Sequence, residues 1–206
     1  MEEDSTKVKI QQVALDLFAK FGYRAVSIRD IGKQVGIKES SIYYHYKNKQ
    51  DILDSIIEQV DVLVDNMRLK FNDAFIKIDR IDESEFAKVA VGVLNNYLLQ
   101  PEVYRLISML TIEKMSDGKA TDAYQRLVFE LPLEQQETVF RMMYNRKFIK
   151  PQDPKLLATQ YYSIIYLVFQ KNCLVAEVTE EDKHKAEVEV YTNVLDFYRR
   201  IREDEK

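Results

Sequence analysis

The side chains of residues 38–46 could bind the edges of DNA bases. Along this stretch, hydroxyl, ammonium and imidazole groups surround one aliphatic residue, Ile42, which a helix would bury. Such groups donate and accept the hydrogen bonds that the grooves of DNA offer. The helix would therefore turn a polar surface outward, formed by Lys38, Ser40, Ser41, Tyr43, Tyr44 and His45.

Two short helices around a tight turn are predicted to position these side chains. Ser27 and Asp30 have the spacing of a capping box at the start of the first helix, and Gly36 is suited to end it. The second helix is predicted from about Lys38 to Tyr46, and Asn48 is expected to cap the next one. This is a helix-turn-helix, whose second helix lies in the major groove.

A first helix from residue 5 or 6 to residue 21, ended by Gly22, completes a three-helix domain over residues 1–48. Its expected core is Phe18, Phe21, Ile31, Val35, Ile37 and Ile42. A long fourth helix is predicted to begin at Lys49 and to continue its apolar stripe as far as Phe71. This helix would join the first domain to a second, over residues 49–206, without a flexible linker.

The second domain is also predicted to be helical. Proline is favoured in the first turn of a helix, and Pro101 and Pro154 stand where apolar stripes begin. Thr179 and Asp182 form another capping box, and Pro132 is expected to separate two segments or to bend one helix. The predicted fold class is all-α, with about nine helices.

The distribution of charge agrees with a DNA-binding first domain. Residues 5–50 contain nine Lys or Arg and three Asp or Glu, a net charge of +6, although the chain as a whole has a net charge of −4. A basic segment attracts phosphate, while an acidic remainder repels it and favours one orientation. A chance fluctuation of surface charge is the alternative.

Features of targeting and of disulfide chemistry are missing from the sequence. The N-terminus, Met-Glu-Glu-Asp, lacks the apolar segment of a signal peptide, and Cys173 is the single cysteine. The longest apolar run, residues 164–169, is far shorter than a bilayer span of about 20 residues. We therefore expect a cytoplasmic protein without a membrane partner.

Two C-terminal helices are more apolar than one neighbour would require. Residues 161–169 are apolar around the whole helix, and the last helix carries two apolar stripes. A second copy of the chain is the simplest partner, because twofold dimers dominate soluble oligomers. A central helix buried within the monomer is the alternative. The expected dimer interface is Tyr161, Ile165, Val168, Phe169, Tyr191, Val194, Leu195 and Tyr198.

The second domain is also rich in Tyr, Phe and Met. Met adapts to irregular space, Tyr adds a polar tip, and apolar pockets with a few polar groups bind small molecules. An ordinary core is the alternative for any one of these residues. The candidate ligand-binding residues are Phe86, Tyr97, Tyr104, Met109, Phe140, Met143, Tyr162 and Tyr166.

Patterns of catalysis and metal binding are missing. The two histidines, His45 and His184, have no Cys or His at metal-ligand spacing, and no glycine-rich phosphate loop or nucleophile elbow occurs. We therefore predict no catalytic residue, no metal site and no cofactor, and we do not expect an enzyme.

Residues 7–53 resemble the TetR (tetracycline-repressor) family of transcriptional regulators. The shared positions are Phe18, Gly22-Tyr23, Ser27, Ile31-Gly32, Gly36-Ile37, the run Ile42-Tyr43-Tyr44-His45-Tyr46, Lys49 and Ile52. The resemblance covers about a quarter of the chain. The rest agrees with the family in length and in its helical, acidic character, which is a less specific likeness.

The resemblance implies roles for individual residues. Ser27 and Lys49 should bind phosphate, and Tyr43 and His45 should contact the backbone or nearby bases. The expected DNA-binding set is Ser27, Lys38, Glu39, Ser40, Ser41, Tyr43, Tyr44, His45, Lys47 and Lys49.

Two departures from the family pattern concern helix stability. Lys38 stands where the family often has serine, so the second helix of the motif is expected to lack its usual cap unless Glu39 or Ser40 substitutes. Gly32 stands where alanine is more usual, which weakens its helix by about 1 kcal/mol at most.

The resulting hypothesis is a homodimeric repressor that binds a palindromic operator on double-stranded DNA and is released by a small molecule of unknown identity. An architectural or protein-recruiting DNA-binding factor of the same fold, without a small ligand, is the alternative. Loss of operator binding on addition of a ligand would separate the two. The sequence does not distinguish repression from activation.

Overall fold

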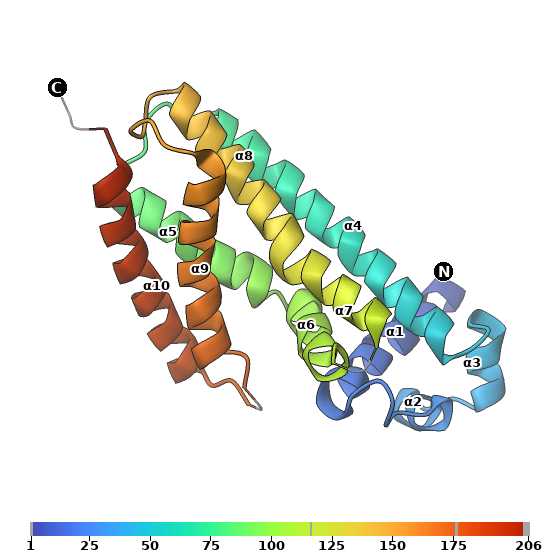
Figure 1. Ribbon diagram of the computed structural model, residues 1–206. Helices are drawn as coiled ribbons and strands as arrows, with labels where there is room; N and C mark the ends of the chain where they lie inside the picture. The colour runs from blue at the N-terminus through green and yellow to red at the C-terminus, as the bar shows by residue number, and fades with distance from the viewer. Residues whose placement is uncertain (1, 116, 176, 204–206) are drawn as a thin grey trace. The chain divides into compact units, whose positions relative to one another are not determined.

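The computed structural model describes residues 2–115, 117–175 and 177–203, which are almost entirely helical (Figure 1). The all-α prediction is confirmed, and the one β pairing in these ranges is an isolated bridge between Ile149 and Arg202. The elements are α1 (Glu2–Phe21), α2 (Ile28–Val35), α3 (Glu39–His45), α4 (Lys49–Ile76), α5 (Glu83–Val93), η1 (Leu94–Leu98), α6 (Pro101–Glu113), α7 (Gly118–Gln125), η2 (Arg126–Glu130), α8 (Leu131–Asn145), α9 (Pro154–Asn172) and α10 (Glu180–Ile201), where η marks a π-helix.

The chain folds into two compact units that do not follow its linear order. Unit 1 contains residues 1–66 and 101–125, and unit 2 contains residues 67–100 and 126–206. The three-helix segment thus shares a compact unit with α6 and α7, which come much later in the chain. The predicted boundary at residues 48 and 49 does not coincide with a boundary between these two units, and the division into two functional domains stays a prediction.

The core of unit 1 is formed by the apolar faces of α1, α2, α3 and α6. Phe18, Ile31 and Ile42 are fully buried there, as the sequence pattern predicts. Phe21 is different, because it is the last residue of α1 and 55% of it is exposed. The Lys20 ammonium lies 5.3 Å from the centroid of its ring, and this exposed phenylalanine does not belong to the core.

The start of α4 has the predicted cap. The Asn48 side chain accepts a hydrogen bond from the backbone N–H of Asp51 at 2.9 Å, and the Asp51 carboxylate accepts one from the backbone N–H of Lys47. The helix then runs without interruption for 28 residues. A single long helix therefore leaves the motif, as predicted.

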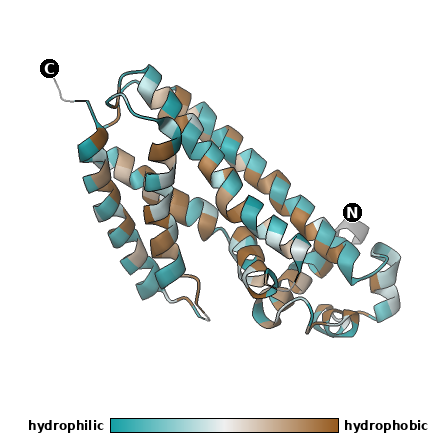
Figure 2. Ribbon diagram, viewed as in Figure 1, coloured by the Kyte–Doolittle hydropathy of each residue, from teal (hydrophilic) through white to brown (hydrophobic). Residues whose placement is uncertain are grey.

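Unit 2 is built from α5, α8, α9 and α10, and α9 packs against both α8 and α10 (Figure 1). Its centre is a group of aromatic rings: Phe86 stacks on Tyr198 with ring centroids 4.4 Å apart, and Phe140 and Tyr161 meet edge to face at 5.6 Å. On the side shown in Figure 2, α10 displays more hydrophilic residues than α9. The ion pair of Arg199 with Glu83 ties α10 to the start of α5.

The helical stretch from residue 118 to residue 145 contains a π-helical segment, η2, directly before Leu131-Pro132. Pro132 has no N–H, so it cannot donate to the carbonyl groups four and five residues earlier, which belong to Val128 and Leu127. Two tyrosine hydroxyls donate to these carbonyls instead, Tyr162 to Val128 at 2.8 Å and Tyr97 to Leu127. The sequence predicts two segments or one bent helix here, and the structure has one stretch with a π-helical interruption.

Among the helices of the described ranges, none combines the length with the apolar character that crossing a bilayer requires.

Candidate nucleic-acid interface

The turn between α2 and α3 has the geometry of a helix-turn-helix. Ser27 caps α2, and its hydroxyl accepts from the backbone N–H of Asp30 while the Asp30 carboxylate accepts from the backbone N–H of Ser27. Gly36 ends the helix in the left-handed conformation, with φ of +84°. A Cβ atom on Gly32 would lie 3.0 Å from the carbonyl oxygen of Ile37, so the turn packs closely on that glycine. The capping box and the glycine stop are both confirmed.

The hydroxyl of Ser27 also donates to the Asp30 carboxylate at 2.6 Å. This side-chain hydrogen bond is the main reason why the pKa of Asp30 lies below its ordinary value, and Arg29 and Lys33 lower it further. Ser27, which the resemblance assigns to phosphate, thus donates its hydroxyl hydrogen to Asp30 within its own helix cap. Its role toward phosphate stays a prediction.

The helix α3 buries one residue and exposes most of the others. Ile42 is fully buried against the core of unit 1, whereas Tyr43 is 53% exposed and Tyr44 is 73% exposed. The Tyr44 and His45 rings meet edge to face, with centroids 5.2 Å apart. The predicted base-reading and backbone-contacting residues are therefore placed on one polar helix: Glu39, Ser40, Ser41, Tyr43 and Tyr44 are exposed, and His45 is half-buried.

Lys38 is the N-cap residue of α3, and its side chain forms no capping hydrogen bond. The exposed side chains of Glu39 and Ser40 follow it in the first turn. The expectation that this helix lacks its usual side-chain cap at residue 38 is confirmed. The first turn of α3 therefore relies on backbone contacts, such as the hydrogen bond from the N–H of Ser41 to the carbonyl of Lys38 at 2.9 Å.

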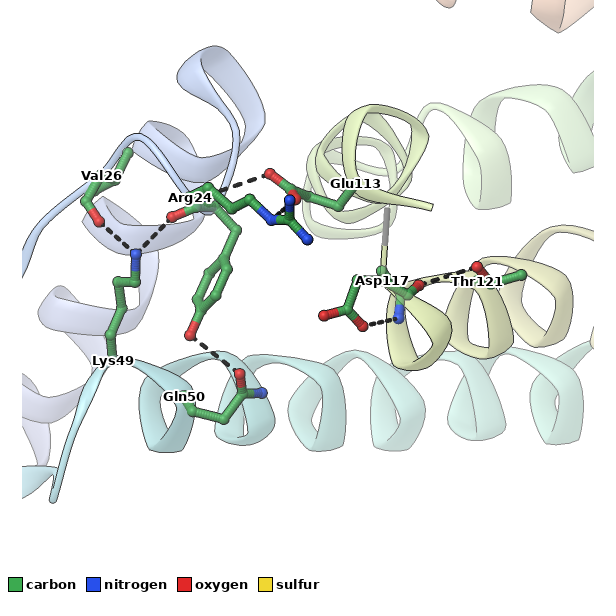
Figure 3. A network of polar contacts seen from close by, with 9 residues as sticks. Arg24, Val26, Lys49, Gln50, Glu113, Asp117 and Thr121 are labelled. Atoms are coloured by element: carbon green, nitrogen blue, oxygen red, sulfur yellow. Dashed lines mark hydrogen bonds and ion pairs between the residues drawn. The ribbon is translucent and has the colours of Figure 1, made fainter. Parts of the chain in front are cut away.

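The two lysines at the start of α4 have different surroundings. Lys47 is exposed, but Lys49 is half-buried and its ammonium donates to the carbonyl of Tyr23 at 2.8 Å and to that of Val26 at 2.7 Å (Figure 3). Partial burial of this ammonium lowers the pKa of Lys49, while the negative charge of Glu113 raises it. The phosphate role that the resemblance gives to Lys49 is not tested by these contacts and stays a prediction.

Sequence reasoning missed a buried carboxylate in unit 1. Glu113, the last residue of α6, is 6% exposed and accepts from the backbone N–H of Arg24 at 3.3 Å. The Arg24 guanidinium lies 3.4 Å from the same carboxylate. The signal was present, because Glu113 follows Leu106 and Leu110 at helical spacing and so stands on the apolar face of α6.

A cavity of about 140 Å³ lies beside Glu113 in unit 1. Its walls combine apolar residues of α4 and α6 with polar groups, and among the predicted ligand-binding residues only Met109 lines it. The hydroxyl of Tyr23, at the edge of this space, donates to Gln50 at 3.0 Å. Desolvation raises the pKa of Tyr23, and the carboxylates of Asp54, Asp117 and Glu113 add to the shift.

The predicted ligand-binding residues do not form one group. Tyr104 and Met109 belong to α6 in unit 1, and the other six belong to unit 2. Phe86, Phe140 and Met143 are almost fully buried in the centre of unit 2. The remaining three lie around η2: Tyr97 and Tyr162 donate to its carbonyls, and Tyr166 meets Phe129 edge to face at 5.2 Å.

The predicted dimer-interface residues are mostly covered by their own chain. Six of the eight are at most 3% exposed, while Tyr191 and Leu195 keep part of their side chains exposed. Other residues of the same two helices point outward, among them Leu167, which is 66% exposed, and Val188, which is 53% exposed. The six covered residues are Tyr161, Ile165, Val168, Phe169, Val194 and Tyr198.

Comparisons with known proteins agree with the motif. Residues 10–56 match the family model of bacterial regulatory proteins, tetR family. Over 52 residues the chain is 44% identical to the biofilm operon icaADBC HTH-type negative transcriptional regulator IcaR of Staphylococcus epidermidis. That match spans 25% of this chain and 28% of the staphylococcal regulator, so it concerns the N-terminal segment alone.

Solved structures share the fold along nearly the whole chain. The structure of a putative TetR-family transcriptional regulator from Mesorhizobium loti covers 98% of this chain with a TM-score of 0.78 and 17% identity. A putative transcriptional regulator from Saccharomonospora viridis, solved in complex with choline, covers 98% with a TM-score of 0.66 and 19% identity. The N-terminal segment of the chain is thus similar in sequence to the TetR family of bacterial regulatory proteins, and the chain shares its fold with a solved TetR-family regulator.

Proposed function

We propose that this protein is a transcriptional repressor that binds a palindromic operator as a homodimer in the cytoplasm and is released by a small molecule. The observation that carries the proposal is the exposed polar face of α3, held on a helix-turn-helix whose sequence matches the TetR family. A helix of this kind places its side chains on base edges in the major groove. The staphylococcal relative is named as a negative regulator, which favours repression.

The homodimer is proposed on the outward faces of α9 and α10. Leu167 and Val188 leave more than half of their surface exposed, and Tyr191 and Leu195 are half-buried beside them on α10. A second copy would cover these apolar side chains in an isologous interface. It would also supply the second reading helix that a palindromic operator requires.

The effector is proposed to bind in unit 2, near η2. Tyr97, Tyr162 and Tyr166 bring aromatic rings and hydroxyl groups to this segment, and Phe129 adds a further ring. Aromatic walls with a few polar groups are typical of small-molecule sites. A related structure holds choline, which supports a small-molecule site on this fold. The effector would lower the affinity for DNA only if it favours a conformation that binds DNA less well.

Selection of duplexes from a random library, followed by fluorescence anisotropy, tests the proposal. We expect a palindromic consensus with half-site centres about 10 to 10.5 base pairs apart, or a multiple of that spacing. Tyr44→Ala should change the selected sequence, because this exposed side chain lies on the reading helix. Tyr144→Ala, which alters an exposed tyrosine of α8, is the matched control and should select the wild-type consensus.

If the wild-type protein enriches no sequence, the proposed DNA reading is wrong. The effector is sought by native mass spectrometry of the purified protein and by adding the identified molecule to the complex with DNA. Release of the selected duplex supports a ligand-responsive repressor. Unchanged binding at a saturating concentration of that molecule would instead favour the alternative, a DNA-binding factor of the same fold without a small ligand.

A further inference from the structure

Two adjacent glutamines of α8 are both buried, but they differ in their hydrogen bonds. Gln135 is 8% exposed and Gln136 is 5% exposed. The amide of Gln135 donates to the Asn72 side chain at 2.7 Å and accepts from the Arg68 guanidinium at 3.4 Å. The side-chain amide of Gln136 forms no hydrogen bond with any residue of the described ranges. This is unusual, because most buried polar side chains in proteins are hydrogen-bonded.

The amide of Gln136 borders space that a small polar group can reach. In the part of the chain that the structure describes, every side-chain nitrogen or oxygen that is fully enclosed has a hydrogen-bond partner. The Gln136 amide has none, so its oxygen and nitrogen are not fully enclosed and share the 5% of the residue that is exposed. A polar ligand group that entered this space would supply the missing partner.

Gln136 lies within an apolar stripe of α8. Pro132 precedes it by four residues and Phe140 follows it by four, so the three share one face of the helix, and both neighbours are buried. Pro132 comes directly after η2 and Leu131, and the ring of Phe140 meets that of Tyr161 in α9, which packs on α8 (Figure 1). Gln136 therefore stands one helical turn from the η2 end of α8 and one turn from the aromatic centre of unit 2.

The chemistry of these surroundings favours an uncharged ligand. Apart from tyrosine, the buried polar side chains among the described residues of unit 2 are Gln135, Gln136 and Asn172, which are all neutral amides. A charged ligand group would find no buried counter-ion there, and its desolvation would be costly. A primary amide has two N–H donors and an acceptor oxygen, so it can form two hydrogen bonds with another amide.

We propose that Gln136 hydrogen-bonds the effector in unit 2, and that the effector is an uncharged, largely aromatic or apolar molecule that carries an amide or a similar group with a donor beside an acceptor. This inference rests on the proposed function and deepens it, because it names a recognition residue and the chemical class of the effector for the same site. Gln135, one residue earlier, has a structural role and supplies the matched control.

The first experiment compares the melting temperatures of Gln136→Met and Gln135→Met by circular dichroism. Methionine has nearly the length of glutamine but lacks its hydrogen-bonding groups. Gln136→Met should keep the melting temperature of the wild type or raise it by up to roughly 4 °C, because an amide without a protein partner is costly to bury. Gln135→Met should lower it, since Asn72 and Arg68 lose their partner. A lower melting temperature for Gln136→Met would show that its amide supports the fold, and would overturn the proposal.

The second experiment uses three probes that share one ring and differ in charge: benzamide, benzoate and benzylammonium. Binding to the wild type and to both variants is measured by NMR titration. We expect the wild type to bind benzamide about tenfold more tightly than either ion, and Gln136→Met to bind benzamide about tenfold more weakly than the wild type does. Gln135→Met should keep the wild-type affinity. The side-chain amide signal of Gln136, identified by its absence in Gln136→Met, should shift when benzamide is added.

Three results would contradict the proposal. No binding of benzamide, or equal binding of the three probes, would exclude an uncharged amide as the preferred group. Equal affinity of the wild type and Gln136→Met for benzamide would show that Gln136 does not bind the ligand. A co-purified effector that carries a net charge, identified by native mass spectrometry, would exclude the proposed class. These measurements do not involve DNA, whereas failure of the wild-type protein to select any duplex contradicts the proposed function, so the two failures are distinguishable.

Discussion

Individual polar residues decide how well the helices of the motif begin. α2 starts with a complete capping box, whereas α3 starts at Lys38 without a side-chain cap. Because both helices are short, a capping hydrogen bond would be a large part of the stability of each, and α3 lacks one. The chain therefore reads DNA, in our proposal, with a helix whose first turn is left less stable than it could be.

Lys38→Ser should stabilise the protein by about 0.5–1 kcal/mol. Serine at this N-cap could accept from the backbone N–H of Ser41, which a lysine side chain cannot do. Urea denaturation followed by circular dichroism measures the change in the free energy of unfolding. Lys47→Ser, at an exposed residue between two helices, is the control and should change it by less than about 0.5 kcal/mol. Equal effects of the two variants would show that capping is not responsible.

Cys173 gives a prediction for alkaline pH. Burial raises the pKa of this thiol from 9.0 to about 11, and the negative charge of Asp182 adds to the shift. Between pH 9 and pH 11 the unfolded chain therefore loses a proton that the folded chain retains. The contribution of the buried thiol is complete below pH 9 and declines by up to roughly 1.4 kcal/mol per pH unit above it.

This dependence is measured as the difference in the free energy of unfolding between wild type and Cys173→Ala, whose side chain does not ionise. We expect the advantage of the wild type to shrink as the pH rises from 8 to 10.5. A difference that stays constant over this range would mean that the thiol ionises as easily in the folded protein as in the unfolded chain.

At the scale of single residues, the sequence predicts local chemistry well and distant partners poorly. The predicted caps of α2, α4 and α10 are confirmed because each depends on residues three apart. The contact of Glu113 with Arg24 joins residues 89 apart, and local spacing cannot reveal it. The hydrogen bonds from the Lys49 ammonium to the carbonyls of Val26 and Tyr23 join residues 23 and 26 apart, so local spacing cannot reveal them either.

At the scale of elements, Pro132 and two tyrosines depend on one another. The proline has no N–H to donate to the carbonyls of Val128 and Leu127, four and five residues earlier, and the hydroxyls of Tyr162 in α9 and Tyr97 in η1 donate to them. The proline alone predicts an interruption, and the structure adds which side chains repair it. This arrangement holds η2 in place, since two of its carbonyls accept hydrogen bonds from tyrosine hydroxyls of two other helical elements.

Tyr162→Phe should destabilise the protein by about 1–3 kcal/mol, because the buried carbonyl of Val128 loses its hydroxyl donor. In a Pro132→Ala background the same change should cost less, since the N–H of the new alanine can reach Val128 four residues earlier. A double-mutant cycle of unfolding free energies measures the coupling.

The control for this cycle is Tyr166→Phe, whose hydroxyl bonds the side chain of Gln170 on the exposed part of the same helix. It should cost less than about 0.5 kcal/mol in both backgrounds. If the cost of Tyr162→Phe is the same with and without the proline, the tyrosine does not compensate for the missing N–H.

At the scale of the whole molecule, the apolar faces of α9 and α10 bear on whether two copies of the chain associate. The apolar character of α9 and α10 predicts burial, and the structure shows that most of that burial occurs inside unit 2. Most residues of the expected interface, such as Tyr161 and Phe169, are therefore already buried by their own chain. Periodicity identifies an apolar face, but it does not say whether the neighbour is the same chain or another copy.

Leu167→Arg tests the outward face of α9. In the proposed dimer this side chain becomes buried, so a charge there should weaken association roughly 30-fold or more. Size-exclusion chromatography with light scattering, over a series of protein concentrations, measures the shift toward monomer. Leu69→Arg changes an equally exposed leucine of α4 and should leave association unchanged. A wild-type protein that is monomeric at every concentration would contradict the dimer.

The discontinuous composition of unit 1 has a consequence for synthesis on the ribosome. The helices of the helix-turn-helix emerge first, but α6, which packs on α1 and supplies Glu113, follows only after residue 100. The nascent helix-turn-helix therefore waits with an uncovered apolar face until α6 has left the exit tunnel. For the same reason, a helix-turn-helix segment transplanted as residues 1–48 onto another regulator would lack part of its own core. A functional graft would have to carry residues 101–125 as well.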